Sequence, residues 1–383
     1  MEYRRLGRTE LQVSLLGVGG GYTMLLDVER GVELYQRAYE QGVNYFDGRY
    51  GDSSLKIRPI IKQDRAHFVV GTKTAETTAE GALHRIDEDL KELDTDYLDV
   101  FYLRSYYHDV LEKHLAPGGS MEGVLKARKQ GKVHFIGLSG HGDLSVLAKG
   151  IETGQVDVVI FPLNIVRREA LQQLIPVAQE HDVGLVVMKP VSVGMIPARL
   201  ALPWLANQPI HTMAPGMSSL EHLEMDVAAL ERDRMALSPE EEAEVEHYRQ
   251  ELDRETCRIC DRICKAACDE GLMIPPLIHH DVFYNQYRSL GLEGFLNHPH
   301  APWVKRAAES HFARRLAMLQ SCTRCGKCEE VCPHDLPIMD MFEVMLEDHL
   351  PLIEALKKRD WAAKYKDAKS PYLQISRATG GAK

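Results

Sequence analysis

The sequence predicts an α/β protein in which a parallel (β/α)8 barrel precedes a smaller, mostly helical domain. From about residue 12 to residue 232, short apolar runs alternate with longer amphipathic stretches, and this strand–helix pattern repeats eight times. All eight cysteines lie beyond residue 256, in two short runs. We therefore expect a barrel over residues 1–235, a helical domain over 236–345 and a charged C-terminal tail over 346–383.

Each predicted strand is a short apolar run. The opening segment MEYRRLGRTELQVS predicts a hairpin ahead of the first barrel strand. In the clearest helix, apolar residues recur at helical spacing over 82–93, and Thr77 and Glu80 have the spacing of a capping box. A second capping box, from Ser238 to Glu241, begins a helix after the barrel. The expected strands are 13–19, 43–46, 67–73, 98–104, 133–139, 156–161, 184–189 and 210–215.

An open, doubly wound sheet is the alternative to a barrel. Its usual signature is a glycine-rich dinucleotide fingerprint after the first strand. The run GVGGGY at 17–22 does not match G-x-G-x-x-G. The barrel is therefore the preferred prediction.

Composition excludes several classes of partner. The formal net charge is −10, which disfavours nucleic acid and anionic membranes because both are polyanions. The N-terminus MEYRRLGRTELQV has no apolar core of a secretory signal, and no apolar run approaches the roughly 20 residues that span a bilayer. We expect a cytoplasmic protein that binds neither nucleic acid nor membrane.

Polar residues follow the ends of nearly all the predicted strands. In a (β/α)8 barrel the chemistry lies at the carboxyl ends of the strands, so these side chains are candidates for one site. Any single one could instead be an ordinary rim residue. The set consists of Asp47, Tyr50, Lys73, Arg104, Ser139, His141, Asn164, Lys189, Gly216, Ser218 and Ser219.

The segments YFDGRYGDS, VVGTKT, DVFYLR, FIGLSGH and MAPGMSSLEHLEMDVAAL follow one another in the order seen in aldo-keto reductases. The chain resembles that family over about residues 1–235. The resemblance implies NADP(H) or NAD(H) bound without a Rossmann fold, and a carbonyl or alcohol substrate. It also implies a catalytic tetrad, in which Asp47, Tyr50 and Lys73 match the aspartate, tyrosine and lysine.

The tetrad chemistry explains these residue types. A tyrosine with a pKa of about 10 is a poor proton donor near neutrality, and a neighbouring ammonium lowers that pKa. Asp47 would keep Lys73 charged and oriented. The tetrad histidine is replaced by Arg104, which can polarise a carbonyl or bind a carboxylate but cannot exchange a proton. His108 is a second candidate for the missing histidine, with an ordinary loop residue as the alternative.

The remaining strand-end residues are candidates for cofactor binding. The loop Pro215–Ser219 leads into a helix, and a helix N-terminus suits a phosphate. Ile160 stands where the family often has a glutamine beneath the nicotinamide. The candidate set is Ser139, His141, Asn164, Lys189, Gly216, Ser218 and Ser219.

The second cysteine run, SCTRCGKCEEVCP, places Cys322, Cys325, Cys328 and Cys332 at C-x2-C-x2-C-x3-C before a proline. That spacing is typical of a 4Fe-4S site. Zinc sites generally use two C-x2-4-C pairs that are well separated. Disulfides need an oxidising compartment, and the N-terminus has no secretory signal that would lead to one. The pattern therefore favours an iron–sulfur cluster.

The first cysteine run, CRICDRICKAACDEG, is less regular. On a straight helix its cysteines would form one seam, but the end thiols would lie about 16 Å apart, too far for one cubane. Sharing between two clusters would resolve this, and the module resembles the dicluster 4Fe-4S domain appended to some aldo-keto reductases. One cluster would take Cys257, Cys260, Cys264 and Cys332, and the other Cys268, Cys322, Cys325 and Cys328.

Between the runs, histidines at 279, 280, 298 and 300 lie in helix-like segments. They could be metal ligands, but packing around the clusters or against the barrel is the preferred interpretation.

Three functions remain open from the sequence. The first is NAD(P)H-linked carbonyl or alcohol redox chemistry, with clusters that exchange electrons with a ferredoxin-like partner. The second keeps that chemistry and makes the clusters structural or sensing groups. The third is an electron-transfer protein whose barrel has lost the standard reductase tetrad. A flavin could join two-electron to one-electron chemistry, but the sequence holds no flavin signature.

Overall fold

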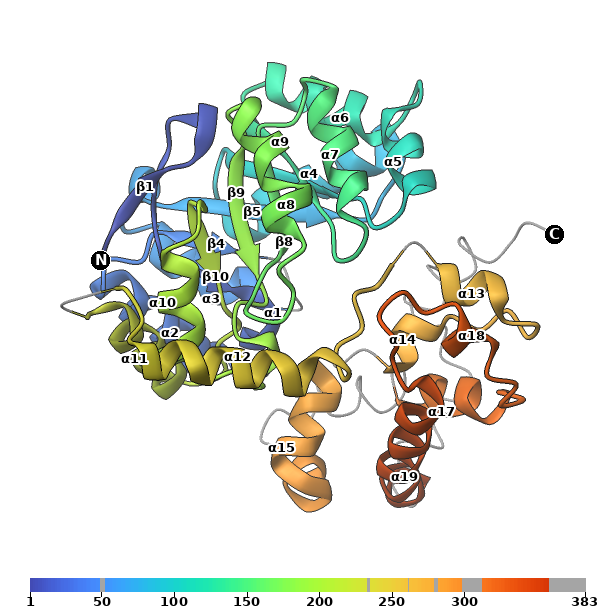
Figure 1. Ribbon diagram of the computed structural model, residues 1–383. Coiled ribbons are helices and arrows are strands. Elements are labelled where there is room, and N and C mark those ends of the chain that lie inside the picture. Colours follow the sequence, from blue (N-terminus) through green and yellow to red (C-terminus); the bar gives the residue numbers. More distant parts are fainter. Residues whose placement is uncertain (49–51, 233–234, 261, 279–281, 298–311, 358–383) are drawn as a thin grey trace. The chain divides into compact units, whose positions relative to one another are not determined.

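The computed structural model describes residues 1–48, 52–232, 235–260, 262–278, 282–297 and 312–357 (Figure 1). The chain divides into two compact units. In the described residues, the first unit comprises 1–253 and 258–260, and the second comprises 254–257 and 262–357.

The first unit is a parallel barrel. Its eight strands are ordered β10-β9-β8-β7-β6-β5-β4-β3, which is the chain order in reverse. Parallel bridges from Leu16 to Met213 and from Gly19 to Gly216 join the last strand to the first. This confirms the predicted fold class. The strands are β3 (Val18–Gly19), β4 (Tyr45–Asp47), β5 (Val69–Thr74), β6 (Leu98–Arg104), β7 (Val133–Ser139), β8 (Val158–Pro162), β9 (Gly184–Met188) and β10 (Thr212–Ala214).

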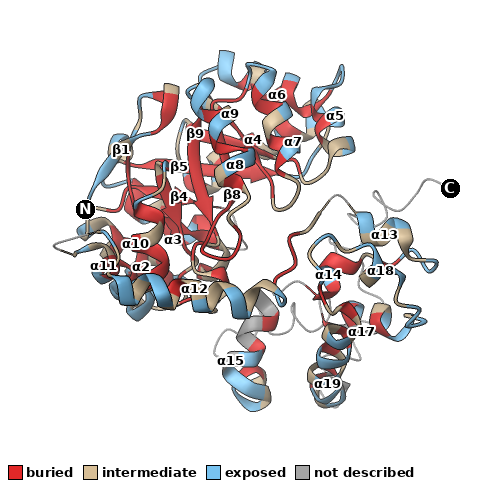
Figure 2. Ribbon diagram, viewed as in Figure 1, coloured by how far each residue is buried: buried red, intermediate tan, exposed pale blue. Residues whose placement is uncertain are grey.

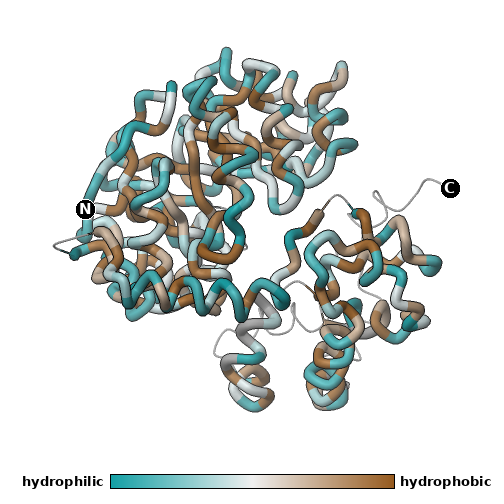
Figure 3. The backbone as a smooth tube through the Cα atoms, in the orientation of Figure 1, coloured by the Kyte–Doolittle hydropathy of each residue, from teal (hydrophilic) through white to brown (hydrophobic). Residues whose placement is uncertain are grey.

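The strands are buried on both faces, as the crossover helices of a barrel require (Figure 2). Alternate side chains point to opposite faces of a strand, so each strand contributes to two cores. The inner core contains Tyr45, Val100, Tyr102 and Ile160. The outer core lies between the strands and the helices, and apolar residues colour the strands brown in Figure 3.

Several helices of this unit begin at a residue whose side chain caps the first turn. Thr78 caps α4 by accepting from the Gly81 amide, one residue after the predicted Thr77. The capping box at Ser238 and Glu241 is confirmed. The helices are α1 (Gly20–Thr23), α2 (Val28–Glu40), α3 (Ser53–Ile61), α4 (Ala79–Leu93), α5 (His108–Leu115), α6 (Ser120–Lys129), α7 (Leu144–Glu152), α8 (Ala170–Gln173), α9 (Ile175–Glu180), α10 (Ala198–Ala206), α11 (Leu220–Leu230) and α12 (Pro239–Asp253).

The predicted domain boundary at residue 235 stays a prediction. Helix α12 follows that residue and is part of the barrel unit. Val245 on α12 packs against Ile165, Val166 and Leu200. These contacts make α12 an addition to the barrel surface.

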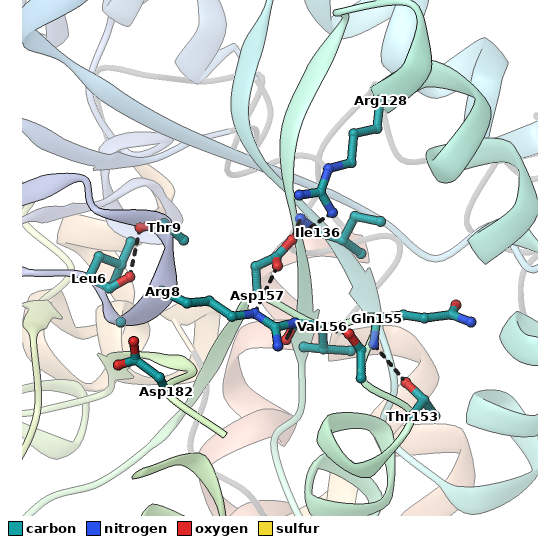
Figure 4. Close-up of polar contacts among 12 residues, drawn as sticks. Leu6, Arg8, Thr9, Arg128, Ile136, Thr153, Gln155, Val156, Asp157 and Asp182 are labelled. Carbon is teal, nitrogen blue, oxygen red and sulfur yellow. Dashed lines mark hydrogen bonds and ion pairs between the residues drawn. The ribbon is translucent and has the colours of Figure 1, made fainter. Parts of the chain in front are cut away.

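The predicted hairpin is formed by β1 (Tyr3–Arg5) and β2 (Gln12–Ser14), which pair antiparallel. Arg8, in the hairpin loop, reaches the amino end of β8 (Figure 4). Its Nε lies 3.0 Å from Oδ1 of the buried Asp157, and Arg128 Nη1 lies 3.2 Å from Oδ2. Asp157 also accepts from the amide of Ile136 at 3.0 Å. One carboxylate thus joins the hairpin, α6 and β7.

Replacing Asp157 by asparagine is expected to destabilise the fold by about 2–3 kcal/mol, because the change removes the charge that both arginines face. The matched control is Asp182→Asn. Asp182 pairs with Arg5 of the same hairpin, and its side chain is 49% exposed. The control should change stability by less than about 1 kcal/mol. Urea unfolding measures the stability of both variants, and an equal loss of stability in the two would contradict the role given to Asp157.

The second unit is helical in its described parts. Its core is aromatic: the ring of Phe312 packs against Tyr287, Phe295 and His349, with centroids 4.9–5.7 Å apart. The helices are α13 (Ile263–Ala267), α14 (Ile274–Ile278), α15 (Val282–Leu296), α17 (Ala313–Gln320), α18 (Lys327–Glu330) and α19 (Ile338–Lys357). The predicted boundary at residue 345 falls inside α19.

The cysteine seam considered for the first run does not form. Of the described residues between Cys257 and Cys268, only Ile263–Ala267 are helical, and Ile259 and Arg262 have left-handed backbones with φ of 55° and 58°. Left-handed residues interrupt a right-handed helix, so the four cysteines cannot lie along one helical face. Histidines 279, 280, 298 and 300 lie outside the described residues. Within the described ranges, no helix combines the length and the apolar character that crossing a bilayer requires.

Candidate active site

Four of the predicted catalytic and binding residues lie at the carboxyl ends of four adjacent strands. Asp47 ends β4, Lys73 lies near the end of β5, Arg104 ends β6 and Ser139 ends β7. Arg104 and Ser139 are partners in the register of β6 and β7. Tyr50, predicted to be catalytic, lies outside the described residues.

Asp47 and Lys73 form a buried ion pair. Lys73 Nζ lies 2.8 Å from Oδ1 and 2.9 Å from Oδ2 of Asp47, and the side chains are 2% and 7% exposed, respectively. Two charges at this depth are costly to desolvate, and the pair persists only because its geometry is close. The pair therefore places one fixed ammonium at the mouth of the barrel.

A tyrosine pair that the sequence analysis did not identify lies near this ammonium. Lys73 Nζ is 5.7 Å from the centroid of the Tyr102 ring, and the Tyr102 hydroxyl is 2.8 Å from that of Tyr45. Gly71 and Gly137 leave room for the ring, since a Cβ on Gly137 would lie 2.2 Å from it. Burial raises the pKa of Tyr102 well above its ordinary value, and the Asp47 carboxylate adds to the rise. Tyr102 is therefore a neutral support for Lys73.

Ser139 carries a buried hydroxyl that can receive a ligand. Its Oγ has no hydrogen-bond partner among the described residues, and the residue is 1% exposed. A buried polar atom of this kind is costly unless another group satisfies it. Ile160, its register partner on β8, is fully buried. An amide or hydroxyl group of a ligand at this strand end would satisfy the Ser139 hydroxyl.

The backbone of Arg104 is held by a histidine that the sequence analysis missed. His114 is fully buried, and its Nε2 donates to the Arg104 carbonyl at 3.0 Å. Burial lowers the pKa of His114, which favours its neutral form. His108 instead lies at the start of α5, with Nε2 3.0 Å from Ser145 Oγ and 3.4 Å from an Asp143 carboxylate oxygen. The ordinary structural interpretation of His108 fits these contacts.

Asn164 uses its side chain to join two loops. Its Nδ2 donates to the Lys189 carbonyl at 3.0 Å, and its Oδ1 accepts from the amides of Val166 and Arg167. The loop after β9 is strained: Lys189, Ser192 and Val193 all have positive φ. Such strain gathers at functional sites. Asn164 and Lys189 remain predictions as cofactor ligands, and the Asn164 side chain joins the loops that carry them.

The loop after β10 leads into α11 as predicted. Ser219 caps this helix through the amide of His222, and Ser218 contacts the His222 ring at 3.3 Å. Gly216 is required because a Cβ there would lie 2.4 Å from the ring of Tyr22. Tyr22 donates to the Val193 carbonyl at 3.4 Å, so three loops meet here. Tyr22 and His222 are further candidates for contact with a bound phosphate.

The thiols of the second unit come from both cysteine runs. Burial, together with the neighbouring charges of Cys322 and Cys268, raises the pKa of Cys328 to about 11. Burial, together with the neighbouring charges of Cys257 and Cys328, raises the pKa of Cys264 to about 12. Cys328 therefore has neighbours in both runs.

An ion pair also joins the two cysteine runs. Lys327 Nζ lies 2.7 Å from an oxygen of Asp269, the residue after Cys268. Among the described residues, no three His, Cys, Asp or Glu side chains converge as ligands of a single ion. Thiolates of a cubane each bind a different iron, so a shared cluster does not need such convergence.

Comparison with known proteins identifies both parts of the chain. Residues 16–199 match the aldo/keto reductase family model, and residues 255–336 match a 4Fe-4S dicluster domain. The barrel thus matches a family of oxidoreductases, and the following segment matches an iron–sulfur domain. More particularly, the chain carries an aldo/keto reductase domain and a C-terminal 4Fe-4S dicluster domain, which confirms the resemblance seen in the sequence.

Individual relatives agree with the barrel assignment. L-galactose dehydrogenase of Arabidopsis thaliana is 25% identical over 300 residues, which covers 64% of this chain and 93% of the relative. Aldo-keto reductase YhdN of Bacillus subtilis is 23% identical over 221 residues, covering 52% and 65%. The structure of aldo-keto reductase AKR11C1 from Bacillus halodurans, 21% identical, superimposes with a TM-score of 0.56 over 65% of this chain and 96% of that chain. This structural match supports the fold.

Proposed function

We propose that the chain is an NAD(P)H-linked oxidoreductase that interconverts a carbonyl and an alcohol and exchanges electrons through 4Fe-4S clusters. The buried Asp47–Lys73 pair carries this proposal, because it places a fixed cation where a substrate oxygen would gain negative charge. The aldo/keto reductase domain and the dicluster domain supply the context for each half.

The residues at the strand ends fit a nicotinamide cofactor. The Ser139 hydroxyl would hold the carboxamide, and the loop from Gly216 to Ser219 would hold a phosphate at the start of α11. A bound nicotinamide would supply the hydride. Lys73 would assist a proton donor, for which Tyr50 remains the candidate. Arg104 cannot transfer a proton, so its proposed role is to polarise the substrate oxygen.

The eight cysteines fit two cubanes in number and in chemistry. The proposed ligands are those predicted from the sequence. Each run supplies three cysteines to one cluster and its remaining cysteine, Cys268 or Cys332, to the other cluster. The neighbours of Cys328 include Cys264 and Cys268 of the first run as well as Cys322, so thiols of the two runs lie close to one another, as sharing requires. A hydride carries two electrons and each cubane moves one. Two clusters together therefore match one hydride, and a ferredoxin-like protein is the proposed redox partner.

A second candidate function rests on Arg104. Where the family has a histidine, this chain has a permanent cation, so the barrel could bind an anionic molecule without reducing it. The chain would then act as an electron-transfer protein. NADPH titration followed by intrinsic fluorescence separates the two functions, since the first requires saturable binding and the second does not. Absence of binding would leave only the second.

Replacing Ser139 by alanine is expected to weaken NADPH binding about 3–10-fold, the worth of one hydrogen bond. The same change should leave the unfolding free energy equal or higher, because the hydroxyl has no partner among the described residues. The matched control is Ser105→Ala, whose hydroxyl already donates to Leu103 O at 3.4 Å. The control should bind NADPH as the unmodified protein does. Unchanged affinity in Ser139→Ala would contradict the role given to Ser139.

A further inference from the structure

The backbone between Cys257 and Cys260 packs on the loop that follows β7. Residues 258–260 are part of the barrel unit. A single nitrogen, Arg167 Nη2, donates to the His141 carbonyl at 2.9 Å and to the Arg258 carbonyl at 3.0 Å. Arg167 thus joins the loop that follows Ser139 to the chain two residues before Cys260.

Gly142 allows this close approach. A Cβ on Gly142 would lie 1.8 Å from the carbonyl oxygen of Ile259 and 2.8 Å from its carbonyl carbon. Those atoms are backbone, so no side-chain rotation could relieve the clash. Any residue other than glycine at 142 would move Ile259, and with it Cys260.

Ile259 is held in an unfavourable conformation. Its φ is +55°, a region that β-branched residues rarely adopt. Strain of this kind persists only where the surrounding contacts over-determine it, and it tends to mark functional sites. The strained residue immediately precedes Cys260 and therefore fixes the path of the backbone that leads into this residue.

The side chain of Arg258 also holds this segment in place. The residue is 7% exposed, and its Nη1 donates to the Asp253 carbonyl at the end of α12, at 2.7 Å. It also forms ion pairs with the carboxylates of Asp253 and Glu169. The contacts of Arg167, Gly142 and Arg258, here called the Cys260 clamp, come from three separate parts of the barrel unit.

We propose that Arg167 and Gly142 are positioning residues that fix Cys260, a proposed cluster ligand, against the loop that follows β7. This inference rests on the proposed function only in taking Cys260 as a cluster ligand. A fixed thiolate sets the surroundings of its cluster, and these control the reduction potential. The clamp therefore affects the electronic properties of one cluster and spares the other.

Two variants of the full-length holoprotein test this inference. Gly142→Ala introduces the clash with Ile259, and Arg167→Met removes the two hydrogen bonds while keeping the aliphatic stem. The matched control is Gly131→Ala, at the other end of β7, where a Cβ meets nothing within 4 Å although φ is +75°. Three properties are measured for all three variants. They are the iron and sulfide content, the electron paramagnetic resonance of the dithionite-reduced protein, and the midpoint potential of each cluster.

Both clamp variants should retain their iron, change the resonance spectrum and midpoint potential of one cluster, and leave the other unchanged. The double variant Gly142→Ala, Arg167→Met should differ little from either single variant in its resonance spectrum and midpoint potential. Arg167→Lys should show a smaller change in both than Arg167→Met. The control should match the unmodified protein. If Gly142→Ala does not fold, Arg167→Met carries the test. Unaltered spectra and potentials in protein that holds iron would overturn the clamp alone, whereas iron-free unmodified protein would overturn the cluster proposal.

Discussion

Replacing Lys73 by methionine is expected to lower kcat/KM for NADPH-dependent carbonyl reduction by about 10³-fold, the scale of assisted proton transfer. The change removes the ammonium that faces the Asp47 carboxylate in the buried pair described above. NADPH consumption over a panel of small aldehydes and ketones measures the effect. A loss smaller than about tenfold would contradict the role of Lys73.

The same substitution should lower the free energy of unfolding by about 3–5 kcal/mol, because it leaves a carboxylate buried without its counter-charge. The double variant Asp47→Asn, Lys73→Met removes both charges and should recover most of this stability while remaining inactive. Such recovery separates catalysis from folding. The matched control, Lys62→Met, breaks an ion pair with Asp94 whose side chains are 55% and 57% exposed, and should change stability by less than about 1 kcal/mol.

Cysteine replacements should reveal how the thiols are divided between clusters. In the proposed sharing, Cys268→Ala and Cys322→Ala damage the same cluster, so each should lower the iron content from about eight to about four, and the pair should lower it no further. Cys268→Ala combined with Cys332→Ala should damage both clusters and remove nearly all the iron. Iron analysis and electron paramagnetic resonance after anoxic purification measure these outcomes.

A variant that changes the ion pair between the runs provides the control. Asp269→Asn weakens the contact with Lys327 but removes no thiol, so the iron content should be unchanged. If Cys268→Ala combined with Cys322→Ala removed nearly all the iron, these two thiols would belong to different clusters, as they do when each run holds its own cluster, and the shared assignment would be wrong.

Much of the barrel follows from local sequence pattern. The strands expected at 98–104 and 133–139 match β6 and β7 to the residue. The hydrophobic runs are long there, and each ends at a polar residue. At α4 the prediction of the cap was one residue early, because Thr77 and Thr78 are adjacent and either could accept the first amide. Such a choice depends on the path of the preceding loop.

The parts that could not be predicted depend on contacts between distant segments. The hydroxyl pair of Tyr45 and Tyr102 needs two strands that are 57 residues apart. Periodicity placed the first cysteines on one helical stripe, but left-handed Ile259 and Arg262 interrupt the helix. The need for glycine at 142 arises only from the approach of Ile259. None of these contacts has a signal within a short window of sequence.

Anaerobic mixing of the holoprotein with NADPH, followed by the visible absorbance of the clusters, tests the central claim that the barrel and the iron–sulfur domain form one redox system. One NADPH yields NADP⁺, a proton and two electrons, enough to reduce two cubanes by one electron each. We expect the absorbance to bleach in proportion to NADPH added, up to one equivalent. Clusters that dithionite bleaches but NADPH leaves fully oxidised would contradict the claim.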